Sequence, residues 1–139
     1  MPGALIQPYI MFGGRCEEAL EFYRTALDAQ IDMLMRFKDS PEPPPADMLP
    51  SGFDNKVMHA SFRIGDNVLM ASDGCEEVQQ YSGISLSISV ATEDEADRFF
   101  TALSDGGQVQ MPLAKTFWSP RFGMLTDRFG ISWMINVVV

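Results

Sequence analysis

An internal repeat is the feature that most constrains how this chain can fold. The segments EALEFYRTAL (18–27) and EADRFFTALS (95–104) align with an offset of 77 residues, with glutamate, alanine and aromatic residues at matching positions. Each carries apolar residues at i, i+3, i+4 and i+7, the spacing of a helix that packs one face on a core. The repeat predicts two helices, over 17–27 and 93–103, the second capped by Thr92 and Glu95.

Strand-like segments flank both predicted helices in the same order. One precedes each helix, at 6–12 and 84–90, and a pair joined by a glycine turn follows, at 57–72 and 121–136. Each half thus predicts a strand, a helix and three strands, an α+β fold of two βαβββ modules. Because neither half covers its sheet on both sides, we expect one domain over 1–139, with repeats of approximately 1–73 and 82–139.

A proline-rich segment separates the two halves of the first repeat. Aligning Gly65 with Gly130 gives an offset of 65 instead of 77, so the second half is 12 residues shorter. The extra residues of the first half coincide with 38–56, which holds five of the nine prolines. Proline neither continues a helix nor donates to a sheet, so this segment is predicted to be a loop. It is either a surface insertion or a partial lid over a binding site.

Alternation within the predicted strands separates a helix-facing side from an opposite side. In ISLSISV (84–90) the aliphatic residues face one way and the three serines face the other. The opposite side is semi-polar and also includes Val57 and Arg63 by this rule. It is either a solvated sheet face or a pocket with apolar walls and a few polar groups. Its other predicted members are Gln7, Tyr9, Met11, His59, Ser61, Ser85, Ser87, Ser132, Met134 and Asn136.

Composition excludes several classes of function. The chain has ten basic and nineteen acidic residues, a net charge of −9, which disfavours nucleic-acid binding. It lacks an apolar run of about 20 residues and a signal-peptide pattern, so we expect a cytoplasmic protein without a membrane partner. Cys16 and Cys75 each stand alone before a Glu-Glu pair, which argues against a disulfide framework or a reactive thiolate.

Candidate chemistry centres on one residue, because His59 is the only histidine. A catalytic metal needs about three His, Asp, Glu or Cys ligands. Only Asp32 among the acidic residues lies well inside a predicted strand, so the residues favour a site without a cofactor and disfavour a divalent metal. The turn-prone stretch from Trp118 to Arg121 adds an indole and a cation that can meet a ligand.

Three ordered segments carry a family resemblance: PYIMFGGRCEEALEFYRTAL, HASFRIGDNVLMASD and FWSPRFGMLTDRFGISWMIN. Together they resemble the PhnB-like family of the vicinal oxygen chelate superfamily, which includes glyoxalase I, fosfomycin and bleomycin resistance proteins and extradiol dioxygenases. The resemblance spans nearly the whole chain. It implies a glyoxalase-like fold in which two βαβββ modules form curled mixed sheets around a cavity.

The resemblance also indicates where a metal would be held. Metal-using members carry His or Glu at four cavity positions, which fall here on Gln7 (or Pro8), His59, Ser85 and Met134. Only His59 keeps a ligating type, so the resemblance implies the cavity without the metal. Ser119 stands where PhnB-like members often have glycine, and no glycine-rich cofactor motif supports the methyltransferase label sometimes given to the family.

We therefore predict a cytoplasmic PhnB-like homodimer that binds a small organic molecule without a metal. The resemblance and the apolar C-terminal run 135–139 both favour the dimer. Two alternatives remain open: a glyoxalase- or lyase-type enzyme with His59 as general base or sole metal-anchoring ligand, and a non-catalytic structural or partner-binding module. The predicted ligand-binding residues are Gln7, Tyr9, His59, Ser85, Trp118 and Met134.

Overall fold

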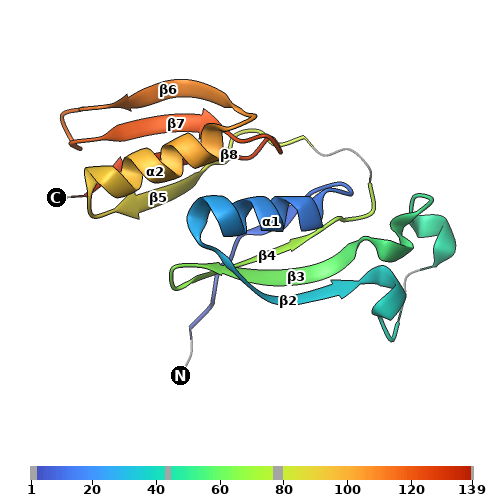
Figure 1. Ribbon diagram of the computed structural model, residues 1–139. Helices are drawn as coiled ribbons and strands as arrows, with labels where there is room; N and C mark the ends of the chain where they lie inside the picture. Colours follow the sequence, from blue (N-terminus) through green and yellow to red (C-terminus); the bar gives the residue numbers. More distant parts are fainter. Residues whose placement is uncertain (1–2, 43–44, 77–79, 139) are drawn as a thin grey trace. The chain divides into compact units, whose positions relative to one another are not determined.

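The computed structural model describes residues 3–42, 45–76 and 80–138 and divides into two compact units, 1–79 and 80–139 (Figure 1). The first unit contains β1 (Tyr9–Met11), α1 (Cys16–Leu27), β2 (Gln30–Arg36), β3 (Val57–Ile64) and β4 (Asn67–Ser72). The second contains β5 (Leu86–Val90), α2 (Glu93–Ser104), β6 (Gln108–Ala114), β7 (Phe122–Thr126) and β8 (Ser132–Val137).

Both units have the same topology. The strand orders are β1-β4-β3-β2 and β5-β8-β7-β6. The pairs β1–β4 and β5–β8 are parallel, and the other neighbouring strands in each sheet are antiparallel. The predicted α+β fold of two βαβββ modules with mixed sheets is thus confirmed.

Each helix packs its apolar side on the sheet of its own unit. Tyr23 of α1 is fully buried, and its ring stacks on Phe62 of β3 at 6.2 Å between centroids. In the second unit the Thr92 hydroxyl accepts the Glu95 N–H at 3.1 Å, which confirms the predicted cap of α2. Among the described residues, neither helix has the length and apolarity needed to cross a bilayer.

The apolar C-terminal run contributes to the core of the second unit. Ile135 and Val137 point to the same side of β8 as the buried Trp133, and all three are nearly inaccessible to solvent. Val138 is 52% exposed, and Val139 lies outside the described residues. Packing in the core of the second unit therefore explains Ile135 and Val137 of 135–139, the run that favoured a dimer.

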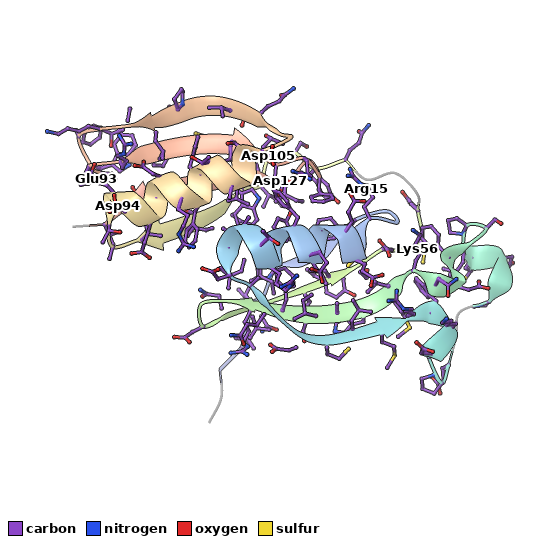
Figure 2. The ribbon with its side chains drawn as sticks, viewed as in Figure 1. Arg15, Lys56, Glu93, Asp94, Asp105 and Asp127 are labelled. Carbon is purple, nitrogen blue, oxygen red and sulfur yellow. The ribbon has the colours of Figure 1, made fainter. Side chains whose placement is uncertain are left out.

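A buried aspartate fixes the turns of each unit. Asp73, directly after β4, accepts the N–H groups of Gly14 (2.8 Å), Cys16 (2.7 Å) and Val57 (2.8 Å). It thereby joins the turn before α1 to the start of β3. Asp127, labelled in Figure 2, lies in the β7–β8 turn. Its carboxylate accepts the N–H groups of Phe129 (2.9 Å) and Ile131 (3.0 Å) and the indole N–H of Trp133 (2.9 Å).

The structure corrects the facing of one residue. Val57 was expected on the side of the sheet opposite the helix, but it is fully buried. The cause is a shift in the β2–β3 register: Met35 pairs with His59 and Arg36 pairs with Val57, so Met58 is an extra residue on β3. Such a bulge inverts the alternation of side chains on the residues beyond it.

Two other segments differ in detail from the expected pattern. The strands β1 and β5 begin later than predicted, so Gln7 and Ser85 precede them. The proline-rich segment contains three short 3-10 helices, η1 (Phe37–Asp39), η2 (Ala46–Met48) and η3 (Phe53–Asn55). Buried Phe37 and Phe53 anchor it, with 6.3 Å between ring centroids. Its residues 43–44 lie outside the described part of the chain.

The Asp73→Asn variant tests the aspartate that joins the turns of the first unit. An amide has one acceptor oxygen where three N–H groups need acceptors, so we expect a loss of about 2 kcal/mol in the free energy of unfolding. Urea denaturation measures this loss. Asp47→Asn, at an exposed position in η2, is the matched control and should change stability by less than about 0.5 kcal/mol. Equal stability of the two variants would show that Asp73 does not anchor the turns.

Candidate functional site

The face of the first sheet that points away from α1 includes two cross-strand rows around Tyr9 and His59, and Arg63 and Val68 continue it beyond them. The pairings Tyr9–Met70, Met70–Ser61 and Ser61–Met33 define one row. The pairings Met11–Ser72 and His59–Met35 place the other four residues in the second row. We call these eight residues the open face of the first unit: Tyr9, Met11, Met33, Met35, His59, Ser61, Met70 and Ser72.

Tyr9 and His59 form a hydrogen-bonded pair on this open face. The Tyr9 hydroxyl lies 3.1 Å from Nδ1 of His59, and the ring centroids are 5.6 Å apart. Tyr9 is 42% exposed and His59 is half-buried. Since this bond engages Nδ1, it orients the imidazole and leaves Nε2 on the opposite side of the ring as the atom that can meet a ligand.

A pocket of about 480 Å³ opens beside this pair. Ser72 pairs with Met11 and is buried at the base of this pocket. Cys75 at the pocket edge is exposed. Sequence reasoning gave Cys75 no role. The pocket combines an aromatic ring and a thioether with a few polar groups, as small-molecule sites do; it is lined by Tyr9, Met11, Ser72, Gly74, Cys75 and Glu76.

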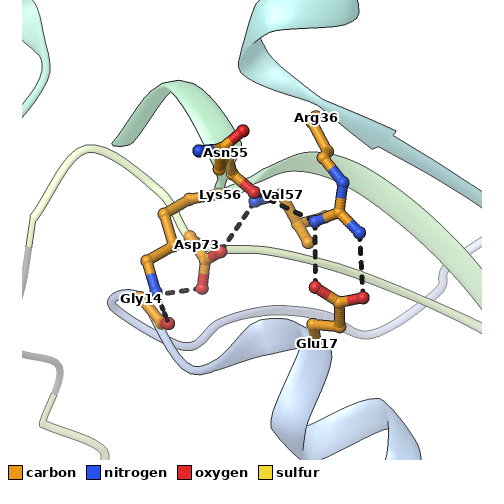
Figure 3. Close-up of a pocket in the computed structure, with 7 residues that line it drawn as sticks. All are labelled: Gly14, Glu17, Arg36, Asn55, Lys56, Val57 and Asp73. Carbon is orange, nitrogen blue, oxygen red and sulfur yellow. Dashed lines mark hydrogen bonds and ion pairs between the residues drawn. The ribbon is translucent and has the colours of Figure 1, made fainter. Parts of the chain in front are cut away.

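A second pocket of the first unit, of about 320 Å³, is lined by groups that bind one another (Figure 3). Arg36 donates to both carboxylate oxygens of Glu17 at 2.9 Å and to the carbonyl of Asn55. These hydrogen bonds hold the pKa of Glu17 below its ordinary value. Lys56 donates to the Gly14 carbonyl at 2.9 Å. Because these side chains bind one another and the Gly14 carbonyl, we infer that they stabilise the turn before α1 and are not available to a ligand.

The second unit repeats the row pattern on its own sheet. Ser87, Met134, Met124 and Met111 follow one another across β5, β8, β7 and β6. Ser85, just before β5, forms a hydroxyl–hydroxyl hydrogen bond of 2.7 Å with Ser132. Met134 thus lies on the face away from α2, as predicted.

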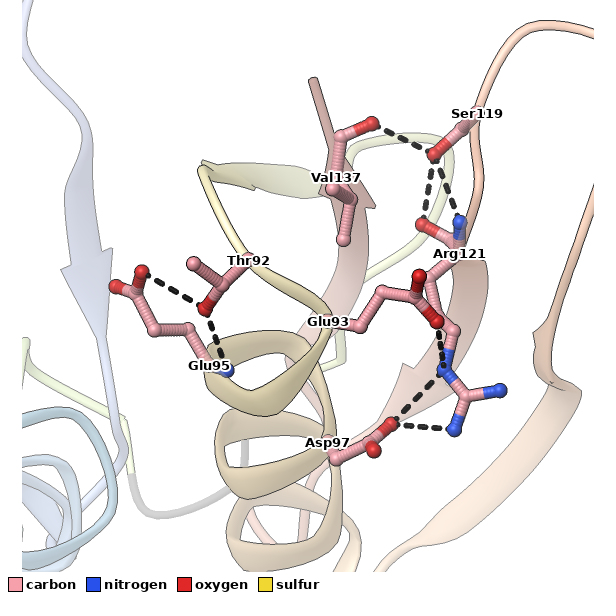
Figure 4. A network of polar contacts seen from close by, with 7 residues as sticks. All are labelled: Thr92, Glu93, Glu95, Asp97, Ser119, Arg121 and Val137. Atoms are coloured by element: carbon pink, nitrogen blue, oxygen red, sulfur yellow. Dashed lines mark hydrogen bonds and ion pairs between the residues drawn. The ribbon is translucent and has the colours of Figure 1, made fainter. Parts of the chain in front are cut away.

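The loop that carries Trp118 is held by Ser119 (Figure 4). The buried Ser119 hydroxyl lies 2.7 Å from the Val137 carbonyl and 2.8 Å from that of Arg121, contacts that glycine could not make. The Trp118 ring is 49% exposed and packs edge-on against Phe122. Trp118 lines a pocket of about 590 Å³ together with Glu93, Lys115, Thr116, Phe117, Ser119, Pro120 and Arg121.

Comparison with known proteins identifies the family. Residues 4–136 match the family described as 3-demethylubiquinone-9 3-methyltransferase. The chain belongs to this PhnB-like family. A PhnB protein from Bacillus cereus is 30% identical and has a TM-score of 0.77 over 97% of this chain and 100% of that one.

Two further relatives resemble the chain over nearly its full length. Protein YjdN of Escherichia coli K12 is 34% identical over 139 residues, 96% of this chain and 95% of its own. The crystal structure of protein PA1353 from Pseudomonas aeruginosa is 41% identical, with a TM-score of 0.85 over 98% of both chains.

A more distant likeness concerns the fold alone. The fosfomycin resistance protein FosX from Listeria monocytogenes is 10% identical and has a TM-score of 0.66 over 100% of this chain and 93% of its own. FosX belongs to the vicinal oxygen chelate superfamily. The PhnB-like resemblance and the glyoxalase-like fold expected from the sequence are thus confirmed.

The metal that the superfamily implies does not fit the donors of this PhnB-like chain. Of the four positions carried over, Gln7, Ser85 and Met134 offer an amide, a hydroxyl already bonded to Ser132, and a thioether. Asp32 in β2 accepts a hydrogen bond from Arg63 at 2.8 Å. Within the described ranges no three His, Cys, Asp or Glu residues gather around one point. Hard divalent ions need several such ligands.

The family's description also implies a methyl donor, but the glycine turn before α1 has no free N–H groups at Gly14 and Cys16 to bind one. Gly13 and Gly14 precede α1, where a helix N-terminus can hold a phosphate or carboxylate. Asp73 already accepts the N–H groups of Gly14 and Cys16 there.

The structure brings together some of the predicted site residues. Tyr9 and His59 are bonded, and Gln7 lies half-buried just before β1 in the same unit. Ser85, Trp118 and Met134 belong to the second unit, and a site shared with the first unit stays a prediction. Sequence reasoning had placed Met11 on this face but missed Met33, Met35 and Met70. Alternation in QIDMLMR (30–36) could have found Met33 and Met35.

The two cysteines should differ sharply in reactivity. Burial, followed by the neighbouring charges of Asp73 and Glu17, raises the pKa of Cys16 far above its ordinary value, whereas Cys75 is exposed. We expect one thiol per native chain to react with Ellman's reagent at pH 8, and none in Cys75→Ser. Rapid reaction of a native Cys75→Ser chain would show that Cys16 is accessible.

Proposed function

We propose that the open face of the first unit binds a small organic molecule beside Tyr9 and His59, without a divalent metal. The observation that carries the proposal is the 3.1 Å contact between His59 and Tyr9, because Tyr9 lines a pocket of about 480 Å³. A pocket of this size suits a small metabolite or drug-like molecule.

The chemistry of the open face supports this choice. The Tyr9 ring and four thioethers provide apolar contact area, and Nε2 of His59 can form an oriented hydrogen bond. FosX, which shares the fold, is a resistance protein whose structure holds Mn(II). The donors of the present chain differ, so we infer binding by shape and hydrogen bonds. Gln7 of the same unit joins this proposed set, and Ser85, Trp118 and Met134 of the second unit stay predicted ligand-binding residues.

A fragment screen followed by substitution tests the proposal. A fragment that raises the thermal midpoint of the native protein is titrated against His59→Ala and Tyr9→Phe by calorimetry. Loss of a hydrogen bond in a partly buried site should weaken binding about tenfold. Val109→Ala, at a position 46% exposed in β6, is the control and should bind normally. Unchanged affinity in His59→Ala for every fragment would reject the proposed site.

The Tyr9–His59 contact also favours a second candidate, a lyase- or glyoxalase-type enzyme with His59 as general base. Tyr9 would orient the ring, and Nε2 would take a proton from a bound substrate. Such an enzyme would exchange the acidic proton of its substrate with deuterium from solvent, and His59→Ala would stop the exchange without preventing binding of a mainly apolar substrate.

We further propose that the chain forms a homodimer in the cytoplasm. The PhnB-like resemblance supports the dimer, and Val138, which is 52% exposed, agrees with it. Sedimentation equilibrium at micromolar concentration should give twice the mass of the 15.5 kDa chain. The mass of one chain would contradict the proposal.

A further inference from the structure

Methionine is concentrated on the sheet faces that point away from the helices. The chain has ten methionines. Four lie on the open face of the first unit, and three lie in one cross-strand row of the second: Met11, Met33, Met35, Met70, Met111, Met124 and Met134. Leucine or valine would provide apolar contact equally well, so the thioether itself is the feature that needs an explanation.

Three of these methionines are cross-strand or diagonal neighbours of His59, the only histidine of the chain. Met35 pairs directly with His59 across β2 and β3. Met33 lies two residues from Met35 on β2. Met70 on β4 is a diagonal neighbour of His59, because Met70 pairs with Ser61, two residues from His59 on β3. Cβ atoms of opposed residues lie about 5 Å apart and diagonal neighbours about 7–8 Å apart, within reach of long side chains.

The cluster is reachable from solvent. Met33 is 41% exposed, and Met35, Met70 and His59 are half-buried. Tyr9 bonds Nδ1 of the imidazole, as the outer partner of a metal-binding histidine does, so Nε2 is the nitrogen available as a ligand. None of the eight open-face residues is a carboxylate, and Asp32 next to this face is paired with Arg63 at 2.8 Å.

We propose that His59, Met33, Met35 and Met70 form a binding site for a soft monovalent cation, Cu(I) or Ag(I). Thioether sulfur and imidazole nitrogen are ligands that suit Cu(I), whereas hard divalent ions prefer oxygen. A monovalent ion also needs less compensating negative charge than a divalent one. The site uses the same face as the proposed organic ligand but does not depend on that ligand.

Cu(I) competition against bicinchoninate, under anaerobic conditions and on protein without an affinity tag, tests the proposal. All variants carry Cys75→Ser, because the exposed Cys75 thiol would itself bind Cu(I). We expect one Cu(I) per chain. Met33→Leu/Met35→Leu removes two sulfurs while conserving volume and should lower the affinity at least about 100-fold. Tyr9→Phe should lower it about tenfold.

Met48→Leu is the matched control, because Met48 lies in η2 and is 58% exposed. Its affinity for Cu(I) should equal that of the Cys75→Ser parent. Titration with Ag(I) by calorimetry should rank the variants in the same order of affinity, and Ag(I) undergoes no redox change. The thermal midpoint of each variant verifies folding, and the single variants Met33→Leu and Met35→Leu replace the double one if it unfolds.

The outcomes separate this site from the organic-ligand site. Loss of Cu(I) binding in Met33→Leu/Met35→Leu with retained fragment binding supports the soft-cation site, because leucine preserves the apolar wall. No withdrawal of Cu(I) from bicinchoninate by the parent, or equal affinity in the double variant, overturns it. Neither of these results bears on fragment binding, which His59→Ala tests separately.

Discussion

Three backbone N–H groups donate to the buried carboxylate of Asp73, and the candidate site depends on this arrangement. Charge-assisted hydrogen bonds of this kind are about twice as strong as neutral ones. They tie the turn between β1 and α1 to the start of β3 and the end of β4. Tyr9 on β1 and His59 on β3 lie on opposite sides of β4, so their 3.1 Å contact requires all three strands to keep this relation.

Charge is distributed so that the open face stays neutral. Arg36 pairs with Glu17 on the helix-facing side, Arg63 pairs with Asp32 at the sheet edge, and Arg121 binds Asp97 in the other unit. In a chain of net charge −9, the eight open-face residues thus offer only thioether, hydroxyl, phenol and imidazole groups, and the charges of Arg63 and Asp32 beside them are paired. Such a surface favours polarizable ligands over hard ions and phosphates.

Local patterns predicted most of the fold. The helical repeat, the Thr92 cap and the paired strand–turn–strand segments each depend on residues close in sequence, and all are confirmed. Val57 was misplaced because the bulge at Met58 is a property of two paired strands, which alternation along one strand does not contain. The place of Ser119 likewise depends on the carbonyl of Val137, 18 residues away.

The sequence predicted only part of the candidate site, because the site also depends on how the strands pair. Alternation placed Tyr9, Met11 and His59 on one face, but the register between strands decides that Met35 and not another residue opposes the imidazole. Cys75 reaches the pocket through the Asp73-Gly74 turn after β4, and the pairing of β4 with β1 is what brings this turn beside Tyr9 and Met11. The pairing of strands distant in sequence therefore determines the neighbours of His59 and Tyr9, which local patterns could not predict.

Methionine methyl NMR tests most directly whether the open face of the first unit is where a small molecule binds. With ¹³C-labelled ε-methyl groups, the methionines report from the open faces and from the exposed Met48. Addition of a stabilising fragment should shift the signals of Met11, Met35 and Met70 and leave Met48 unchanged. A bound fragment that moves none of the open-face signals of the first unit would contradict the account.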